Sequence, residues 1–293
     1  MKIYSWSISK ETTFNFCKKK YYLNYLRQYD EQNFFDDSNE IIILKKLRNR
    51  FAFRKKIISN TINLIISDRM YGFENDEKFY VQSAIKELSE IIVKSNNLFE
   101  KYYNINHTID YVKFYYETGI CIENFIRSDI FSQIKRTQMQ NIFLVNLDQS
   151  NINATPVFTL NQTGIQISGG PDLYILENKN LKIYNWKMTG NNSKDCDYRT
   201  AAAISYLYLK NLLSYEFDKY DLIQIYFFFI PENKTIVLDD KKELKKVVEN
   251  FQKNLKTSII NLKNADSESE DFFSKTQDTD NCRFCNFKKL CRF

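Results

Sequence analysis

The centre of the predicted core is the segment Gly169-Gly-Pro-Asp172-Leu-Tyr-Ile-Leu-Glu177-Asn-Lys-Asn180-Leu-Lys-Ile-Tyr-Asn185-Trp-Lys187. Residues 173–176 and 181–187 are rich in β-branched, aromatic and aliphatic side chains, which favour strands. The four polar residues between them favour a turn, so the stretch predicts a β-hairpin.

The register of this hairpin follows from its turn. If the two central polar residues form the loop, counting outward from it places Asp172 opposite Asn185. Side chains alternate between the faces of a strand, so Asn185 and Lys187 point the same way. We therefore expect Asp172, Asn185 and Lys187 to meet at the open end of the hairpin.

This arrangement resembles the PD-(D/E)XK nuclease superfamily, in which a Gly-x-x-Asp strand start precedes an acidic-x-Lys strand. The resemblance implies an α/β, restriction-endonuclease-like core with a mixed sheet flanked by helices, plus an N-terminal helical insert. In that family two carboxylates hold Mg²⁺ or Mn²⁺, and the Lys activates water or stabilises the transition state. Here Asn185 stands where the family has Asp or Glu, so metal binding is expected to be weakened.

Two further motifs of the family are also altered. A helix over residues 42–66 places Ser59 and Asn63 where the family has His and Glu. On a later helix, Tyr206 matches the Tyr of a Gln-x-x-x-Tyr motif, but Ala202 occupies the Gln position. The resemblance therefore implies a degenerate catalytic site consisting of Asp172, Asn185, Lys187 and Tyr206.

The chain closes on Cys282-x2-Cys285-x5-Cys291, which is a compact arrangement of thiols. Thiolates bind zinc or iron–sulfur clusters, and with Cys17 they make four ligands. The layout resembles the RecB- and AddB-like iron–sulfur exonucleases, which favours a [4Fe–4S] cluster over zinc. A cluster there would join the first helix to the last residues.

The N-terminal segment predicts a short extended stretch followed by an amphipathic helix, with Ser9 as its cap. It resembles the start of RecB- and AddB-like nucleases, in which an aromatic residue and Cys precede a basic-Tyr-Tyr run. In that interpretation Lys18, Lys19 and Lys20 contact phosphates. The alternative is a solvated basic face beside an aromatic core stripe.

We expect one nuclease-like domain over residues 1–293. Its parts are an N-terminal helix (1–30), a helical subdomain (31–140), an α/β core (141–263) and a linker with a cysteine tail (264–293). Within the core, period-two patterns predict strands at 142–147, 155–160 and 164–168 before the hairpin, then a helix at 198–215, strands at 222–230 and 235–238, and a helix at 241–262. His107 in a loop, Cys121 on an apolar helix face and Cys196 are not expected to be functional.

Composition sets the remaining limits. Among 293 residues, 43% hydrophobic and 16% aromatic content indicates a packed globule and excludes a disordered chain. A net charge of +6 is compatible with a polyanionic partner. No apolar run approaches the length of a membrane span, so we expect a cytoplasmic protein that does not enter the membrane.

Two functions from different classes follow. The first is an iron–sulfur protein of nuclease fold that binds DNA or a helicase or other nuclease subunit, with impaired or lost catalysis. The second is an active Mg²⁺- or Mn²⁺-dependent DNA exonuclease or endonuclease that uses Asp172 and Lys187, with Glu177 or Asp148 as the missing carboxylate. DNA repair and defence against foreign DNA are both open.

Overall fold

The computed structural model describes residues 4–27, 37–73, 75–105, 109–145, 156–160, 164–188, 198–276, 282–283 and 285–291. The chain forms two compact units, each built from discontinuous segments. Unit 1 comprises the chain start through Ser5, Arg54–Glu90 and Asp110–Lys253, and unit 2 comprises Trp6–Phe53, Ile91–Ile109 and Asn254–Phe293. The helices expected to form one subdomain over 31–140 are therefore divided between the two units.

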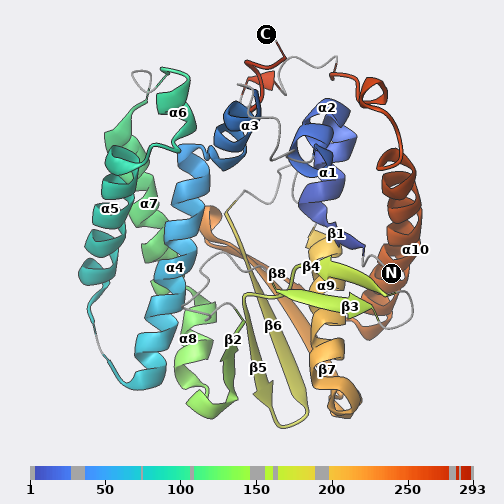
Figure 1. Ribbon diagram of the computed structural model, residues 1–293. Helices are drawn as coiled ribbons and strands as arrows, with labels where there is room; N and C mark the ends of the chain where they lie inside the picture. Colours follow the sequence, from blue (N-terminus) through green and yellow to red (C-terminus); the bar gives the residue numbers. More distant parts are fainter. Residues whose placement is uncertain are drawn as a thin grey trace. The chain divides into compact units, whose positions relative to one another are not determined.

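Unit 1 contains a five-stranded mixed sheet in the order β2-β5-β6-β7-β8 (Figure 1). Only β6 and β7 are parallel, and the other neighbours are antiparallel. The expected α/β class with a mixed sheet flanked by helices is confirmed. The strands are β2 (Ile142–Leu144), β5 (Leu173–Glu177), β6 (Asn180–Lys187), β7 (Leu222–Phe229) and β8 (Lys234–Leu238).

The β5–β6 hairpin has the predicted register. Glu177 pairs with Asn180 across a two-residue loop, and Asn178 takes the left-handed conformation, with φ 53°, that such a loop requires. At the other end Leu173 pairs with Tyr184, and the Asp172 N–H donates to the Tyr184 carbonyl at 2.9 Å. Asp172 therefore lies next to Asn185, as expected.

The two strands before the hairpin do not join this sheet. β3 (Val157–Leu160) and β4 (Ile165–Ser168) pair antiparallel in a separate sheet of order β1-β4-β3, in which β1 is Ser5–Ser7. The chain leaves this sheet through Gly169, which has φ 147° and lies so close to Ile204 that a Cβ would stand 2.9 Å from its Cγ2. The strands predicted at 155–160 and 164–168 therefore form, but in a sheet apart from that of the hairpin, because a period of two identifies strands but not their partners.

Helices cover both faces of the five-stranded sheet. Trp186 and Asn185 are neighbours on β6 and so face opposite sides. The Trp186 ring meets Phe125 of α7 at 5.4 Å between centroids, whereas the Asn185 amide contacts Ser205 of α9. The helices with residues in unit 1 are α4 (Arg50–Tyr71), α5 (Glu77–Lys94), α7 (Tyr111–Ile126), α8 (Asp129–Arg136), α9 (Tyr198–Leu213) and α10 (Lys241–Ala265).

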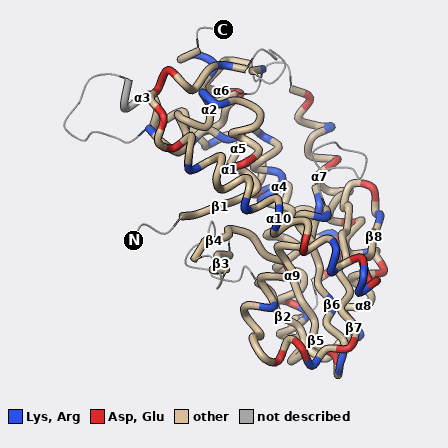
Figure 2. The backbone as a smooth tube through the Cα atoms, turned by 90° about the vertical axis from the view of Figure 1, so that its right-hand side faces the viewer, with Lys and Arg blue, Asp and Glu red and all other residues tan. Residues whose placement is uncertain are grey.

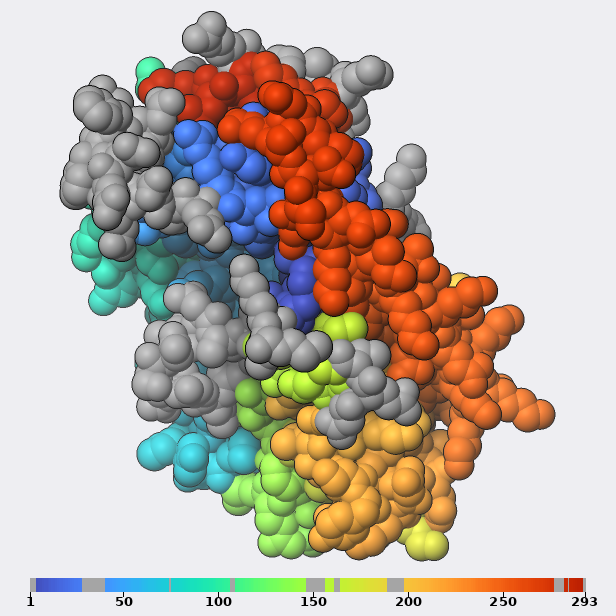
Figure 3. Space-filling view, turned by 45° about the vertical axis from the view of Figure 1, so that its right-hand side comes forward, coloured from blue at the N-terminus to red at the C-terminus, as the bar shows by residue number. Residues whose placement is uncertain are grey.

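α10 is amphipathic, as its sequence predicts. Leu244, Val247 and Phe251 are buried, while the lysines between them are exposed. Figure 3 shows this helix, in orange, at the molecular surface. No helix in the described part of the chain is at once long enough and apolar enough to cross a membrane.

Unit 2 begins with a helical segment that Cys17 interrupts. Ser7, not Ser9, caps α1, because the Ser7 Oγ accepts the Lys10 N–H at 3.1 Å, so the helix starts two residues earlier than expected. Cys17 is extended, with φ −158°, and the chain then re-enters a helix. The helices with residues in unit 2 include α1 (Ile8–Phe16), α2 (Lys18–Tyr21), a π-helix (Tyr22–Leu26), α3 (Asp37–Lys46) and α6 (Phe99–Tyr102). Short 3₁₀ helices occur at Met139–Asn141, Ser214–Lys219, Ile230–Glu232 and Glu270–Phe272.

Candidate functional site

The first candidate site lies in unit 1 and consists of Asp172, Asn185 and Lys187, which we call the hairpin centre. The Asp172 Oδ2 accepts the backbone N–H of Trp186 at 2.7 Å. The carboxylate thus continues the hydrogen bonding between β5 and β6 beyond the last strand pair. This bond fixes the carboxylate beside Asn185 at the open end of the hairpin.

Burial raises the pKa of Asp172 above its usual value, because removal from water disfavours the charged form. The Trp186 N–H, Lys187 and Lys55 each act in the opposite direction and lower this pKa. Lys55 belongs to α4 and matches no motif of the sequence. Its effect on the Asp172 pKa is electrostatic.

Asn185 is almost fully buried, with 4% of its surface exposed. Its Oδ1 accepts the Ser205 hydroxyl at 2.9 Å, and its Nδ2 is buried without a hydrogen-bond partner among the described residues. One of the two lone pairs of this oxygen is therefore already used by Ser205. Ser205 matches no motif, and only the packing of α9 on the sheet reveals its contact.

Lys187 lies on the same face of β6 as Asn185. Its Nζ stands 5.4 Å from the centroid of the Phe227 ring, and Phe227 is the residue of β7 paired with Asn185. The Lys187 amine therefore turns back toward the Asn185 position. Tyr198, the first residue of α9, also contacts this ring, at 5.6 Å between centroids.

The other residues of the expected catalytic motifs are placed differently. Ala202 is buried one turn before Ser205 on the same face of α9. The Tyr206 ring instead packs edge-on against Phe217 at 4.9 Å, and burial raises the pKa of its hydroxyl. No contact in the described structure brings Tyr206 to the hairpin centre.

On α4, Lys55, Ser59 and Asn63 recur every four residues and share one side of the helix. The Oδ1 of Asn63 is buried and has no hydrogen-bond partner in the described segments. Among the described residues, no hydrogen bond or ion pair joins Ser59 or Asn63 to Asp172. Neither residue supplies a carboxylate or an imidazole.

Glu177 does not replace the missing carboxylate. It lies at the turn end of β5, five residues from Asp172, which corresponds to about 17 Å along a strand. Its carboxylate accepts from Lys182 at 2.8 Å and from Thr137 at 2.9 Å, and the Lys182 bond keeps its pKa low. Figure 2 shows acidic and basic positions side by side at this end of β5 and β7.

The second candidate site lies in unit 2, where Cys17, Cys282, Cys285 and Cys291 line one pocket. We call it the cysteine pocket. The Cys17 Sγ caps α2 by accepting the Lys20 N–H at 3.4 Å, so the break in the N-terminal helix turns this thiol toward the pocket. Cys17 from the first helical segment and the three cysteines of the last twelve residues thus line the same pocket.

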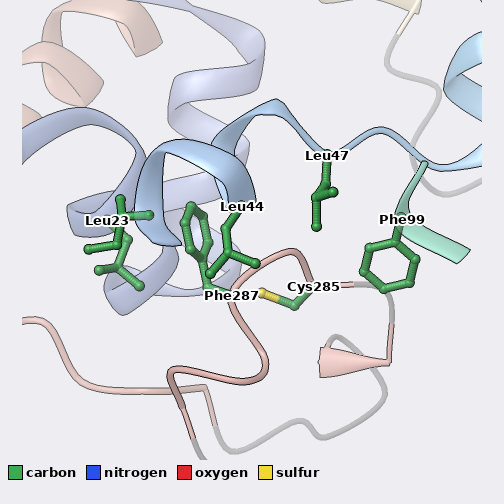
Figure 4. Close-up of a cluster of buried hydrophobic side chains, with 7 residues drawn as sticks. Leu23, Leu44, Leu47, Phe99, Cys285 and Phe287 are labelled. Carbon is green, nitrogen blue, oxygen red and sulfur yellow. The ribbon is translucent and has the colours of Figure 1, made fainter. Parts of the chain in front are cut away.

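The C-terminal segment is anchored beside the pocket by a buried hydrophobic cluster. Figure 4 shows Cys285 and Phe287 among leucines of the N-terminal helices, with Phe287 fully buried. Asn286 lies between them, and its Nδ2 donates to the carbonyls of Leu44 and Leu47 at 3.0 Å each. These contacts anchor the segment that carries Cys285.

Positive charges surround the cysteine pocket. Burial raises the pKa of Cys285, while the Phe287 N–H and Lys20 lower it. Burial also raises the pKa of Cys291, against the effect of Lys275, whose Nζ donates to the Cys291 carbonyl at 2.6 Å. Backbone N–H groups and lysines are the surroundings that favour thiolates and the anionic centres they form with metals.

The pocket is lined by four thiols, and thiolates are the ligands that zinc and iron–sulfur clusters use. Within the described residues, no three thiol, imidazole or carboxylate side chains are arranged to hold a single metal ion. The free volume of the pocket is about 10 Å³, which is room for about one water molecule. A bound cluster would therefore require the thiols to move apart.

The three lysines expected to contact phosphates are engaged within unit 2. The Lys18 amine lies 4.3 Å from the Phe272 ring centroid, and Lys19 forms a 2.6 Å ion pair with Glu270. Lys20 lines the cysteine pocket. These contacts agree better with a basic face beside aromatic residues than with lysines that contact phosphates.

The other cysteines, His107 and Asp148 add no described residue to either site. Cys121 is buried on α7 with a raised pKa caused by burial, in agreement with a core position. His107, Asp148 and Cys196 lie outside the described residues.

Comparisons of the chain with protein-family models, curated protein sequences and solved structures gave no significant match.

Proposed function

We propose that this chain is a DNA-binding protein of PD-(D/E)XK nuclease type that carries an iron–sulfur cluster and has impaired or lost catalysis. One observation carries the proposal most strongly. The register of the β5–β6 hairpin brings Asp172, Asn185 and Lys187 together in the spatial order of the family's metal-binding motif.

The core of unit 1 is restriction-endonuclease-like in this proposal. Its support is a mixed sheet with a central hairpin, a parallel β6–β7 pair and a helix, α9, that follows the hairpin and packs on the Asn185 side. Lys55 of α4 acts electrostatically on Asp172, which is a further support.

Impaired catalysis follows from the ligands that remain. Phosphodiester hydrolysis by Mg²⁺ or Mn²⁺ requires hard, negatively charged oxygens that hold the metal and polarise water. Asp172 is one such ligand, but the Asn185 amide is neutral and its oxygen already accepts from Ser205. The centre thus lacks the charge that would hold a catalytic cation.

The four cysteines would hold a [4Fe–4S] cluster, with zinc as the alternative. A cluster supplies iron–thiolate bonds that tie Cys17 to the three C-terminal thiols and so stabilise unit 2. Lys20 and Lys275 offset its negative charge. A helicase or another nuclease subunit is the type of protein partner that this family resemblance suggests.

The test combines cleavage and binding of end-labelled single- and double-stranded DNA, with Mg²⁺ or Mn²⁺ present. The natural sequence is compared with Asn185→Asp and Lys187→Ala. We expect DNA binding that weakens as salt increases, without cleavage, and cleavage that appears only in Asn185→Asp. Absence of DNA binding at low salt, together with absence of cleavage in every variant, would refute the proposal.

A second candidate is an active metal-dependent nuclease. The observation that favours it is that Asp172 and Lys187 are retained beside each other. It predicts cleavage by the natural sequence that EDTA and Lys187→Ala both abolish. Because Glu177 is committed to Lys182, the missing carboxylate would have to come from another residue.

A further inference from the structure

The hairpin centre has the charge of an anion site. Lys187 and Lys55 both act electrostatically on the Asp172 carboxylate. Among these three described groups, the ammonium groups outnumber the carboxylate. This excess favours an anion such as phosphate over a divalent cation.

A buried hydrogen-bond donor at the same place points to the same class of ligand. Asn185 Nδ2 is buried and has no partner among the described residues, while Oδ1 is occupied by Ser205. Buried donors are nearly always paired, so an unpaired one indicates a missing acceptor. The acceptor-rich oxygens of a phosphate meet this requirement directly or through one ordered water.

The neighbouring elements place further donors around Asn185. The Lys187 amine lies over Phe227, the strand partner of Asn185, and Tyr198 brings the first turn of α9 to the same ring. α9 has 16 residues, so its N-terminus carries an appreciable positive partial charge. The amide, the amine and the helix start thus surround one position.

We infer that the hairpin centre binds a phosphate group rather than a divalent cation, with Lys187 Nζ and Asn185 Nδ2 as donors and Lys55 as a second positive charge. This inference rests on the proposed DNA-binding function and names the chemistry of its site. Asn185 places a neutral amide donor where a carboxylate would favour a cation, and this suits a phosphodiester.

The experiment is isothermal titration calorimetry with two probes, inorganic phosphate and a dithymidine phosphodiester, and Mn²⁺ binding measured by electron paramagnetic resonance. The protein is the full chain, and the variants are Lys187→Met, Lys55→Met and Asn185→Asp. Lys86→Met is the matched control, because Lys86 is an exposed lysine on α5.

We expect the natural sequence to bind at least one of the phosphate probes. Lys187→Met and Asn185→Asp should weaken this binding by about tenfold or more, since each removes a donor to a charged group. Lys86→Met should leave it unchanged, and Mn²⁺ should bind Asn185→Asp more tightly than the natural sequence. The phosphodiester arm shows whether the ligand is a nucleic-acid backbone or free phosphate.

Three results would overturn the inference. The first is phosphate binding that Lys187→Met and Lys55→Met leave unchanged, and the second is Mn²⁺ binding by the natural sequence as tight as by Asn185→Asp. The third is DNA binding by a protein that binds neither phosphate probe. Both lysine side chains reach solvent, so these variants keep the test valid if Asn185→Asp does not fold. DNA binding without phosphate binding would refute the inference but not the proposed function. Phosphate binding without DNA binding would refute the proposed function but not the phosphate site.

Discussion

Replacing Asp172 by Asn is expected to leave the protein as stable as before, or more stable, at pH 7. The carboxylate has a raised pKa because it is removed from water, so its charged form costs free energy in the folded state. An Asn side chain removes this charge, and its Oδ1 still accepts the Trp186 N–H that now bonds to Asp172 at 2.7 Å. Asp172→Ala removes the acceptor as well and leaves a buried backbone donor unpaired.

The magnitudes follow from these two changes. An unpaired buried donor costs about 1–3 kcal/mol, which is the loss expected for Asp172→Ala. For Asp172→Asn we expect a change between zero and about 1 kcal/mol of added stability at pH 7, because loss of the charge and loss of the attraction to Lys187 and Lys55 oppose each other.

The pH dependence has a definite sign. The folded state keeps the Asp172 proton to higher pH than the unfolded state, whose value is near the ordinary 3.8. The unfolded state therefore binds fewer protons between these two values, and stability falls as pH rises through that window. Below this pH window, the stability of the natural sequence relative to that of Asp172→Asn should be higher than at pH 7.

Urea unfolding followed by circular dichroism, from pH 3.5 to pH 8, measures these differences. The matched pair Asp172→Asn and Asp172→Ala separates the charge from the hydrogen bond. A loss of more than about 2 kcal/mol in Asp172→Asn at pH 7 would show that the charge stabilises the fold. A difference from the natural sequence that does not change with pH would refute the role assigned to burial.

Three further changes test unit 2. Phe287→Ala should lower the free energy of unfolding by about 3–5 kcal/mol in urea, since it empties a fully buried position, whereas the partly exposed Phe272→Ala should cost under about 1 kcal/mol. Glu100→Ala removes a buried carboxylate that accepts the first amide N–H of α4, and it should lower the free energy of unfolding by about 3–5 kcal/mol. Glu100→Gln should lower it clearly less. Equal losses in the two variants would contradict this prediction. Cys285→Ser should abolish visible absorbance and bound iron and lower the melting temperature, whereas Cys121→Ser should retain the metal; iron in both variants would exclude Cys285 as a ligand.

Local sequence signals predicted the elements that depend on neighbouring residues. The register of the central hairpin came from its turn, because a two-residue loop with Asn178 at positive φ leaves one way to pair the strands. The spacing of Cys282, Cys285 and Cys291 likewise predicted that these thiols converge, and all three line one pocket.

The parts that failed depend on long-range packing. Ser205 and Lys55 reach the hairpin centre because α9 and α4 pack beside β6 and Asp172, and no local pattern encodes these contacts. The separate pairing of β3 and β4 is equally a matter of partner choice. The Ser7 cap was missed for a different reason, since Ser7 and Ser9 are both plausible caps and only the hydrogen bond distinguishes them.

The anchoring of the C-terminal segment on the N-terminal helices has a consequence for synthesis on the ribosome. Leu44 leaves the ribosome 243 residues before Phe287, which packs in the same buried cluster. At about 5–20 residues per second, this interval is roughly 12–50 s. During that time the leucines of the first helices lack their final cover, so nascent chains of this protein should depend on chaperones, or on delayed collapse of unit 2, until their last residues emerge.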